Sequence, residues 1–166
     1  MAAPFLIERL GSSHNRESFS CGVEALDQYF RTQATQDVRR RAAACYVAIE
    51  AAGAKVAGFY TLAAAGVPLA EMPAELAKRL PRYPSVPVAR LGRLAVDQAY
   101  RGRKLGSALL WDAVQRSLRS EIAVFALVVD AKDDQAEAFY RHHGFVAFGS
   151  RPRQFVLPLT SFVAKG

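Results

Sequence analysis

The chain has 166 residues, of which 51% are hydrophobic, and this is enough for one domain with a sizeable core. No apolar run approaches the ~20 residues of a membrane-spanning helix, and no secretory leader or cysteine pattern for disulfides or zinc is present, so we expect a cytoplasmic protein without a metal. The formal net charge of +7 favours an anionic partner such as nucleic acid or a charged cofactor, with a merely basic surface as the open alternative.

The first part of the chain predicts a strand, a long helix and a hairpin. Residues 5–10 have a strand pattern, and the apolar side chains of residues 23–38 recur at helical spacing on one face. This spacing predicts one long amphipathic helix. Two strand-like runs follow at residues 45–49 and 56–62, joined around Gly53 as in a hairpin.

The remainder of the chain alternates between helices and strands. The predicted elements are a short helix at residues 73–80, a strand in “VARLGRLAVDQ” after Pro87, a helix at 105–119, a buried strand at 123–129, a helix at 134–142 that ends at Gly144, and two final strands within “FVAFGSRPRQFVLPL”. This order, with an antiparallel pair in front, indicates the α/β class and a single domain over residues 1–166, with a mixed sheet flanked by helices.

The segment “DQAYRGRKLGSALL” places glycines and cations directly before a predicted helix. The first turn of a helix presents backbone N–H groups that have no intrahelical acceptor, and these groups favour phosphate. Gly102 and Gly106 would let a diphosphate approach the backbone, and Arg101, Arg103 and Lys104 add positive charge. The pattern matches neither Walker A nor a dinucleotide fingerprint. We interpret it as a diphosphate-binding loop, with a glycine-tightened turn and a solvated basic rim as the alternative.

The stretches “LGRLAVDQAYRGRKLGSALL” and “VVDAKDDQAEAFYRHHGF” together resemble the GNAT superfamily of N-acetyltransferases. The loop of that family reads Arg/Gln-x-x-Gly-x-Gly/Ala; Arg101 and Gly106 match its ends, and Lys104 replaces its middle glycine. This replacement weakens the motif but does not exclude binding of the cofactor, because a residue in the first turn of a helix needs no positive φ. The resemblance implies the GNAT fold, with a mixed and mostly antiparallel central sheet, and acetyl-CoA as the cofactor.

The same resemblance implies roles for individual residues. The pantetheine arm would pair with the strand before the loop, and backbone N–H groups near Val96 could steady the carbonyl oxygen of the acetyl group. Tyr140 would donate a hydrogen bond to the leaving thiolate, with a packing aromatic as the alternative reading. We interpret His142 and His143 as surface groups at a helix end. The implied cofactor-binding residues are Leu94, Ala95, Val96, Arg101, Gly102, Arg103, Lys104, Leu105, Gly106, Ser107 and Asp130.

A second resemblance covers most of the chain and centres on “FSCGVEALDQYFRTQATQDVRRRAAACYVAIE”, which is similar to acetyltransferase toxins of the TacT and AtaT type. It implies acetylation of the α-amino group of aminoacyl-tRNA, a ribbon-helix-helix antitoxin as partner, and a homodimer. An α-amine suits a site without an evident base, because its reference pKa of ~7.7–8.0 leaves a neutral fraction at pH 7.

Five arginines lie where tRNA phosphates could be bound. Arg39, Arg40 and Arg41 close the first predicted helix, and Arg90 and Arg93 lie on the strand before the loop. For the first three, a solvated helix end is the alternative. Two other functions stay open, namely acetyl transfer to a small amine or a protein N-terminus, and a catalytically silent acetyl-CoA-binding module. Retention of the tyrosine argues against the silent module.

Overall fold

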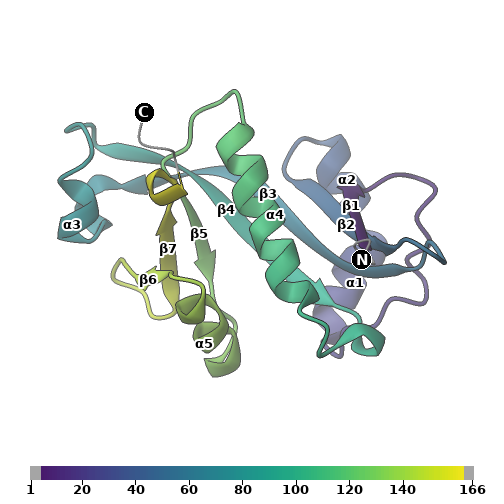
Figure 1. Ribbon diagram of the computed structural model, residues 1–166. Helices are drawn as coiled ribbons and strands as arrows, with labels where there is room; N and C mark the ends of the chain where they lie inside the picture. Colours follow the sequence, from purple (N-terminus) through teal and green to yellow (C-terminus); the bar gives the residue numbers. More distant parts are fainter. Residues whose placement is uncertain (1–4, 163–166) are drawn as a thin grey trace. The chain divides into compact units, whose positions relative to one another are not determined.

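A computed structural model describes residues 5–162 of the chain (Figure 1). Within this range the strands form one seven-stranded sheet in the order β1-β2-β3-β4-β5-β7-β6. The strands are β1 (Phe5–Arg9), β2 (Ala44–Glu50), β3 (Val56–Pro68), β4 (Ser85–Val96), β5 (Ala126–Asp130), β6 (Val146–Ala147) and β7 (Gln154–Pro158). The helices are α1 (Glu24–Thr32), α2 (Ala34–Arg39), α3 (Ala74–Ala77), α4 (Leu105–Arg119) and α5 (Asp134–His142), with short 3₁₀ turns η1 (Leu69–Glu71), η2 (Gln98–Tyr100) and η3 (Leu159–Phe162).

The sheet is mixed and mostly antiparallel. The pairs β1–β2, β2–β3, β5–β7 and β6–β7 are antiparallel, whereas β4 and β5 run parallel. A parallel pair needs a long crossover connection, and here the connection contains α4. The predicted α/β class, with a mixed sheet flanked by helices, is confirmed.

Residue contacts divide the chain into two compact units, and the long elements β3, β4 and α4 contribute to both. The first unit takes in the chain up to Ala63 together with Gly92–Ala113. The second takes in Ala64–Leu91 and the chain from Val114 onward. Each unit has its own cluster of buried apolar side chains. The extent of one domain over residues 1–166 stays a prediction.

Aromatic side chains fill the core of the first unit. Phe30 of α1 stacks on Phe59 of β3 with 4.2 Å between the ring centroids, and Phe19 meets both rings edge-on. All three side chains are almost completely buried. Each such burial contributes about 1.5–3 kcal/mol to folding, so α1 is held to the sheet by the apolar face that the helical spacing predicted.

The predicted single helix over residues 23–38 is wrong, because α1 and α2 are separated at Gln33. Gln33 still donates its N–H to the Tyr29 carbonyl over 2.8 Å, but its φ of −112° departs from helical values. Thr32, directly before it, donates its hydroxyl to the Gln28 carbonyl over 2.7 Å. Back-bonding of this kind bends helices, and it gives a physical reason for the break.

Other elements also have bounds that differ from the prediction, and β4 begins at Ser85, before Pro87. β3 continues to Pro68. The alanines and the glycine before Pro68 have low β propensity, so this part of the chain is a strand because it pairs with the neighbouring strand. Gly66 permits a close approach there, because a Cβ atom on it would lie 2.8 Å from the Ser85 hydroxyl oxygen. α3 covers only Ala74–Ala77, and β5 begins at Ala126.

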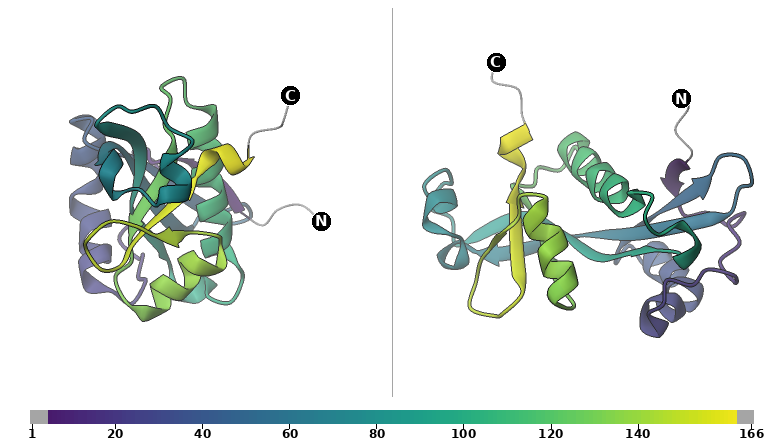
Figure 2. Two further views of the ribbon diagram at one scale, coloured as in Figure 1. Left: turned by 90° about the vertical axis from the view of Figure 1, so that its left-hand side faces the viewer. Right: turned by 60° about the horizontal axis from the view of Figure 1, so that its bottom comes forward.

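Valine side chains dominate the core of the second unit. Val88 on β4, Val128 on β5 and Val156 on β7 are fully buried. β5 is buried along almost its whole length, as its continuous apolar run predicted. α5 lies beside β7 in both Figure 1 and the right view of Figure 2.

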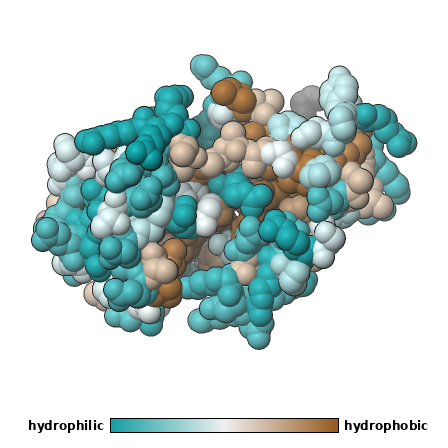
Figure 3. All heavy atoms as spheres, turned by 180° about the vertical axis from the view of Figure 1, so that it is seen from behind, coloured by the Kyte–Doolittle hydropathy of each residue, from teal (hydrophilic) through white to brown (hydrophobic). Residues whose placement is uncertain are grey.

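Large hydrophobic side chains that are exposed within residues 5–162 lie in separate parts of the chain, and include Leu6 on β1, Trp111 on α4, and Tyr83 and Ile122 in loops. The face shown in Figure 3 is largely hydrophilic, with smaller hydrophobic patches. No helix in the described range combines the length and the apolar content that crossing a bilayer would require.

Candidate functional site

The loop between β4 and α4 is anchored by Asp97, a buried residue that is not among the predicted site residues. Its carboxylate accepts hydrogen bonds from the N–H groups of Ser20 and Ala99, over 3.0 and 2.9 Å. Its own N–H donates to the Ala57 carbonyl over 2.8 Å. An aspartate that bonds the backbone two residues further on forms an Asx turn, which is a signal that the sequence does carry. Asp97 therefore fixes the start of the loop within the first unit.

Lys104 has a left-handed backbone, with a φ of 60°, directly before the first residue of α4. The expectation that this position needs no positive φ is wrong, because Lys104 precedes the helix and does not lie in its first turn. Gly102 also has a positive φ, of 79°, and a Cβ atom on it would meet nothing within 4 Å. Two left-handed residues thus turn the chain into the helix, and the lysine adopts at a cost the conformation that glycine adopts freely.

The start of α4 has the features of an anion site. The Ala108 N–H donates to the Lys104 carbonyl over 3.2 Å, so the N–H groups of the turn before it face the loop. The first turn contains no acidic residue, and the dipole of this 15-residue helix adds positive potential there. Gly106 and Ser107 lie in this turn. The structure therefore brings the predicted pyrophosphate-binding residues to one helix start.

Two of the three cations in the loop are held against the protein. Arg101 donates from Nη2 to the Cys21 carbonyl over 2.8 Å. The Arg103 guanidinium carbon lies 5.0 and 5.4 Å from the ring centroids of Phe5 and Tyr100. These guanidinium groups have defined positions. The lysine side chain makes no such contact with the described part of the chain.

The end of β4, which is predicted to pair with the cofactor, lies tightly against β3. Ala95 is buried, whereas Leu94 and Val96 are half-buried. A Cβ atom on Gly58 would lie only 2.9 Å from the Ala95 carbonyl oxygen. A larger residue at this glycine position would therefore push the two strands apart.

Arg93 stacks on Tyr29 in the first unit, with 3.6 Å between the guanidinium carbon and the ring centroid. The Tyr29 hydroxyl donates to Asp37 over 2.7 Å. This hydrogen bond is the main cause that lowers the pKa of the Asp37 carboxyl, and the charges of Arg93 and Arg40 lower it further. Burial in turn raises the pKa of Tyr29. Two of the predicted tRNA-binding arginines thus act on one carboxylate, a relation that sequence spacing does not reveal.

Arg39, Arg40 and Arg41 are exposed at the end of α2. Within residues 5–162 none of them forms an ion pair. Arg41 has a φ of 59° and occupies the left-handed position after a helix, where glycine is usual. The turn therefore carries three positive charges that no carboxylate of the described chain pairs with directly, and this arrangement suits contacts to phosphate.

Arg90 and Asp130 form an ion pair in the second unit, with 3.0 Å between Nη1 and Oδ2. The pair follows from the strand register, because Arg90 lies opposite Val128 and Asp130 is two residues further along β5. Arg90 is a predicted tRNA-binding residue, and Asp130 is a predicted cofactor-binding residue. Their pairing offsets part of the charge that Arg90 could offer to phosphate.

Tyr140 lies buried on α5, where its ring meets the rings of Phe139 and Phe145, each with 5.3 Å between centroids. Burial raises the pKa of its phenol to about 12. Among residues 5–162 no group forms a hydrogen bond with its hydroxyl. A phenol that is protonated at neutral pH and has no hydrogen-bond partner in the described part of the chain can donate its hydrogen bond to another molecule.

The end of α5 accounts for His143 without a catalytic role. Its Nδ1 lies 2.8 Å from the Phe139 carbonyl, and because a carbonyl only accepts, Nδ1 carries the hydrogen. Gly144, with a φ of 94°, donates its N–H to the Arg141 carbonyl over 3.1 Å and ends the helix as predicted. His142 is exposed. These contacts fit the interpretation of both histidines as groups at a helix end.

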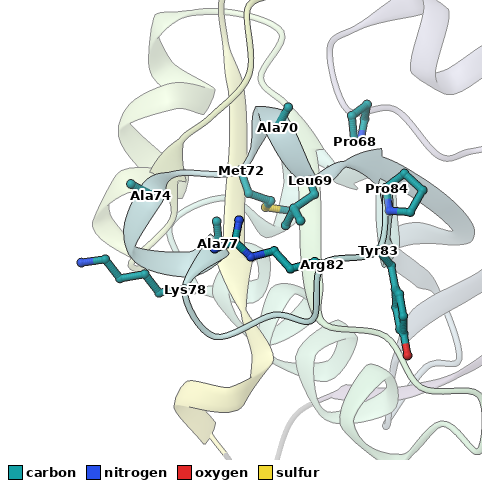
Figure 4. A pocket seen from close by; sticks show the side chains of 10 residues that line it. All are labelled: Pro68, Leu69, Ala70, Met72, Ala74, Ala77, Lys78, Arg82, Tyr83 and Pro84. Carbon is teal, nitrogen blue, oxygen red and sulfur yellow. The ribbon is translucent and has the colours of Figure 1, made fainter.

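A cavity of about 680 Å³ lies in the second unit, and Figure 4 shows its lining side chains. The lining residues are Pro68, Leu69, Ala70, Met72, Ala74, Ala77, Lys78, Arg82, Tyr83 and Pro84. Most of them are apolar, and none is a predicted site residue. The cavity therefore adds no residue to the candidate site.

Known proteins resemble the chain over nearly its whole length. Residues 8–145 match the acetyltransferase (GNAT) family. A tRNA-acetylating toxin of Mycobacterium tuberculosis (strain ATCC 25618 / H37Rv) is 36% identical over 151 residues, which cover 90% of this chain and 89% of that protein.

Solved structures of the toxin AtaT are also similar. AtaT complexed with acetyl-methionyl-tRNAfMet has a TM-score of 0.86 and 27% identity, with 95% of this chain and 96% of that chain covered. AtaTR bound with AcCoA has a TM-score of 0.79 and 26% identity, with 95% of both chains covered. An AtaT mutant toxin bound to the C-terminus of the antitoxin AtaR has a TM-score of 0.77 and 25% identity, with 96% of both chains covered.

Proposed function

Because this chain belongs to the acetyltransferase (GNAT) family, we propose that it is an acetyl-CoA-dependent N-acetyltransferase toxin that acetylates the α-amino group of aminoacyl-tRNA. The family resemblance given by the sequence is confirmed by the match over residues 8–145. The relative that is 36% identical is a tRNA-acetylating toxin, and AtaT has been solved with acetyl-methionyl-tRNAfMet. These proteins support both the reaction and the acceptor.

The observation that carries the proposal is the start of α4. Gly102 and Lys104 turn the chain into a helix whose first turn has no acid, and Arg101 and Arg103 flank that turn. These features fit the pyrophosphate of acetyl-CoA, because backbone N–H groups, the helix dipole and nearby cations all favour a double negative charge. Leu94, Ala95 and Val96 on the strand before the loop would hold the pantetheine arm. The family and the structure of AtaTR bound with AcCoA support this cofactor.

Acetyl-CoA supplies an acetyl thioester when bound. The acceptor nitrogen would bond to the acetyl carbon, the carbon–sulfur bond would break with its electron pair on sulfur to leave the CoA thiolate, and the proton lost from nitrogen would pass to water. Tyr140 is proposed to donate its hydroxyl hydrogen bond as charge collects on sulfur. With its pKa near 12, full proton transfer to a thiolate of reference pKa ~8.5 would be uphill by about 5 kcal/mol. Hydrogen bonding without complete transfer is therefore the role that fits this phenol.

The arginines of the first unit are proposed to hold tRNA phosphates. The exposed Arg39, Arg40 and Arg41 offer charges without an ion-pair partner in the described range, and Arg93 is stacked in a fixed position. Arg90 is a weaker candidate, because Asp130 already pairs with it. The same pairing weakens the assignment of Asp130 to the cofactor.

The further partners belong to the proposal as well. A ribbon-helix-helix antitoxin is proposed to neutralise the protein, and the complex of AtaT with the C-terminus of its antitoxin supports an antitoxin of some kind. A homodimer and a cytoplasmic location complete the proposal. Acetylated aminoacyl-tRNA cannot serve as an acceptor of the growing peptide, so expression without an antitoxin is expected to arrest growth.

The deciding experiment offers several acceptors to the purified protein with labelled acetyl-CoA. The acceptors are a pool of charged tRNAs, the same pool after deacylation, small amines, and N-terminal peptides. Label is expected on charged tRNA alone. Efficient turnover of a small amine or peptide, without label on charged tRNA, would replace the toxin function with that of a general acetyltransferase. Binding of acetyl-CoA without transfer to any acceptor would indicate the catalytically silent module.

A further inference from the structure

Arg153 joins two segments of the second unit that flank the start of α5. It lies directly before β7 and has a left-handed backbone, with a φ of 64°. Its carbonyl accepts a hydrogen bond from the Ala131 N–H over 2.9 Å, just after β5. Its guanidinium donates to Asp134 over 2.8 Å and to Glu137 over 3.1 Å. One residue thus holds both the segment that leads into α5 and the first turns of that helix.

A second arginine completes the attachment of α5 to β7. Glu137 also pairs with Arg141, with 3.6 Å between Oε1 and Nη2. Arg141 lies over the ring of Phe155 on β7, with 4.8 Å between the guanidinium carbon and the ring centroid. Glu137 is therefore shared by two cations, of which Arg153 precedes β7 and Arg141 contacts it. Figures 1 and 2 show α5 lying alongside β7.

The position of the Tyr140 hydroxyl depends on this attachment. Tyr140 lies three residues after Glu137, about one helical turn further along the same side of α5. Its ring has apolar contacts with Phe139 and Phe145, but no hydrogen bond from residues 5–162 holds its hydroxyl. The location of the hydroxyl is therefore set by where the helix lies. A shift or rotation of α5 would move it directly.

We propose that Arg153 is a positioning residue that holds α5 so that the Tyr140 hydroxyl meets the sulfur of acetyl-CoA. The role rests on the proposed function, since it requires the acetyl transfer that Tyr140 assists. An arginine kept in a left-handed conformation that glycine would adopt more easily indicates that its side chain is needed there. Displacement of a catalytic group by about 1 Å can cost on the order of 10²-fold in rate.

The first test measures steady-state kinetics of charged-tRNA acetylation. Arg153→Ala is expected to lower kcat by about 10- to 100-fold and to leave KM for acetyl-CoA unchanged. Arg153→Lys retains one cation and is expected to recover part of the rate. Arg153→Gly frees the backbone but lacks the guanidinium, so it is expected to be as slow as Arg153→Ala. Arg151→Ala removes an exposed arginine of the same turn that forms no hydrogen bond, ion pair or ring contact in the described range, and it serves as the matched control.

The second test combines Arg153→Ala with Tyr140→Phe. If Arg153 acts through the Tyr140 hydroxyl, the double variant is expected to be no slower than Tyr140→Phe alone. Circular dichroism confirms that each variant is folded at the assay temperature. Full kcat in Arg153→Gly, or an equal further loss in the Tyr140→Phe background, would overturn the positioning role while the wild-type protein stays active. Failure of the wild-type protein to acetylate charged tRNA would instead overturn the proposed function, and the positioning role with it.

Discussion

Replacing Lys104 with glycine is expected to stabilise the protein, although it removes a residue of the proposed cofactor loop. A non-glycine residue in the left-handed conformation pays roughly 1–2 kcal/mol, and Lys104 has a φ of 60°. Glycine at an unstrained position costs about 0.4–1 kcal/mol through the greater freedom of the unfolded chain. The difference leaves a net gain of about 0.5–1 kcal/mol. At about 2–4 °C per kcal/mol for a chain of this size, Lys104→Gly should melt about 1–4 °C higher than wild type.

Thermal unfolding followed by circular dichroism checks this value, with two controls. Lys104→Ala removes the same charge but keeps the Cβ atom, so it should not raise the melting temperature. Lys132→Gly changes an exposed lysine without a positive φ, and it should lower the melting temperature. Acetyl-CoA affinity, compared between the two Lys104 variants, separates the effect of the backbone from that of the charge. The reasoning is refuted if Lys104→Gly melts as far below wild type as Lys132→Gly does.

Three further predictions concern the site. Gly106→Asp should abolish detectable binding of acetyl-CoA in calorimetry, because a carboxylate at the start of α4 repels phosphate; tight binding by this variant would contradict the loop assignment. Tyr140→Phe should lower kcat by about 10²–10⁴-fold without changing acetyl-CoA affinity. Because the pKa of Tyr140 is raised to about 12, its hydroxyl stays protonated from pH 7 to 10. Wild-type kcat should therefore rise as the pH passes ~8, where the acceptor amine deprotonates, and should not fall again up to pH 10. A fall in kcat near pH 9 would show that another group donates the hydrogen bond to sulfur. Arg93→Ala should weaken tRNA binding and reduce the slope of log affinity against log salt concentration by roughly 0.7–0.9. A slope equal to those of the wild type and of Arg151→Ala would show that Arg93 does not contact tRNA phosphate.

Local patterns predict much of this fold. The helical spacing of apolar residues, the hairpin around Gly53 and the buried run of β5 each depend on residues close together in sequence. The prediction of one continuous helix over residues 23–38 was wrong because the helix is interrupted after Thr32, whose hydroxyl bonds to the backbone. The spacing of apolar residues does not reveal this hydrogen bond. The far end of β3 was not predicted, because its small residues become a strand only beside their neighbour β4.

In the candidate site, too, the features that depend on neighbouring residues were predicted, and those that depend on distant residues were not. The glycines, cations and helix start of the cofactor loop are contiguous in sequence, so the motif predicts them directly. The lysine itself carries no signal for the left-handed φ of residue 104, and only the glycine that the family loop has at this position indicates it. The pairing of Arg90 with Asp130 and the contacts of Arg153 with α5 join residues that only the strand register and the packing bring together.

The contact among Tyr29, Asp37 and Arg93 also restricts how the chain can diverge. Loss of the Tyr29 hydroxyl would leave the Asp37 carboxylate without its hydrogen bond, and loss of Arg93 would uncover the face of the Tyr29 ring. Replacing one of the three residues therefore leaves the other two without a contact that stabilises them, whereas replacing all three together leaves no group without its partner. Although more than fifty positions separate Arg93 from the other two, the three residues are expected to be inherited, or exchanged, together.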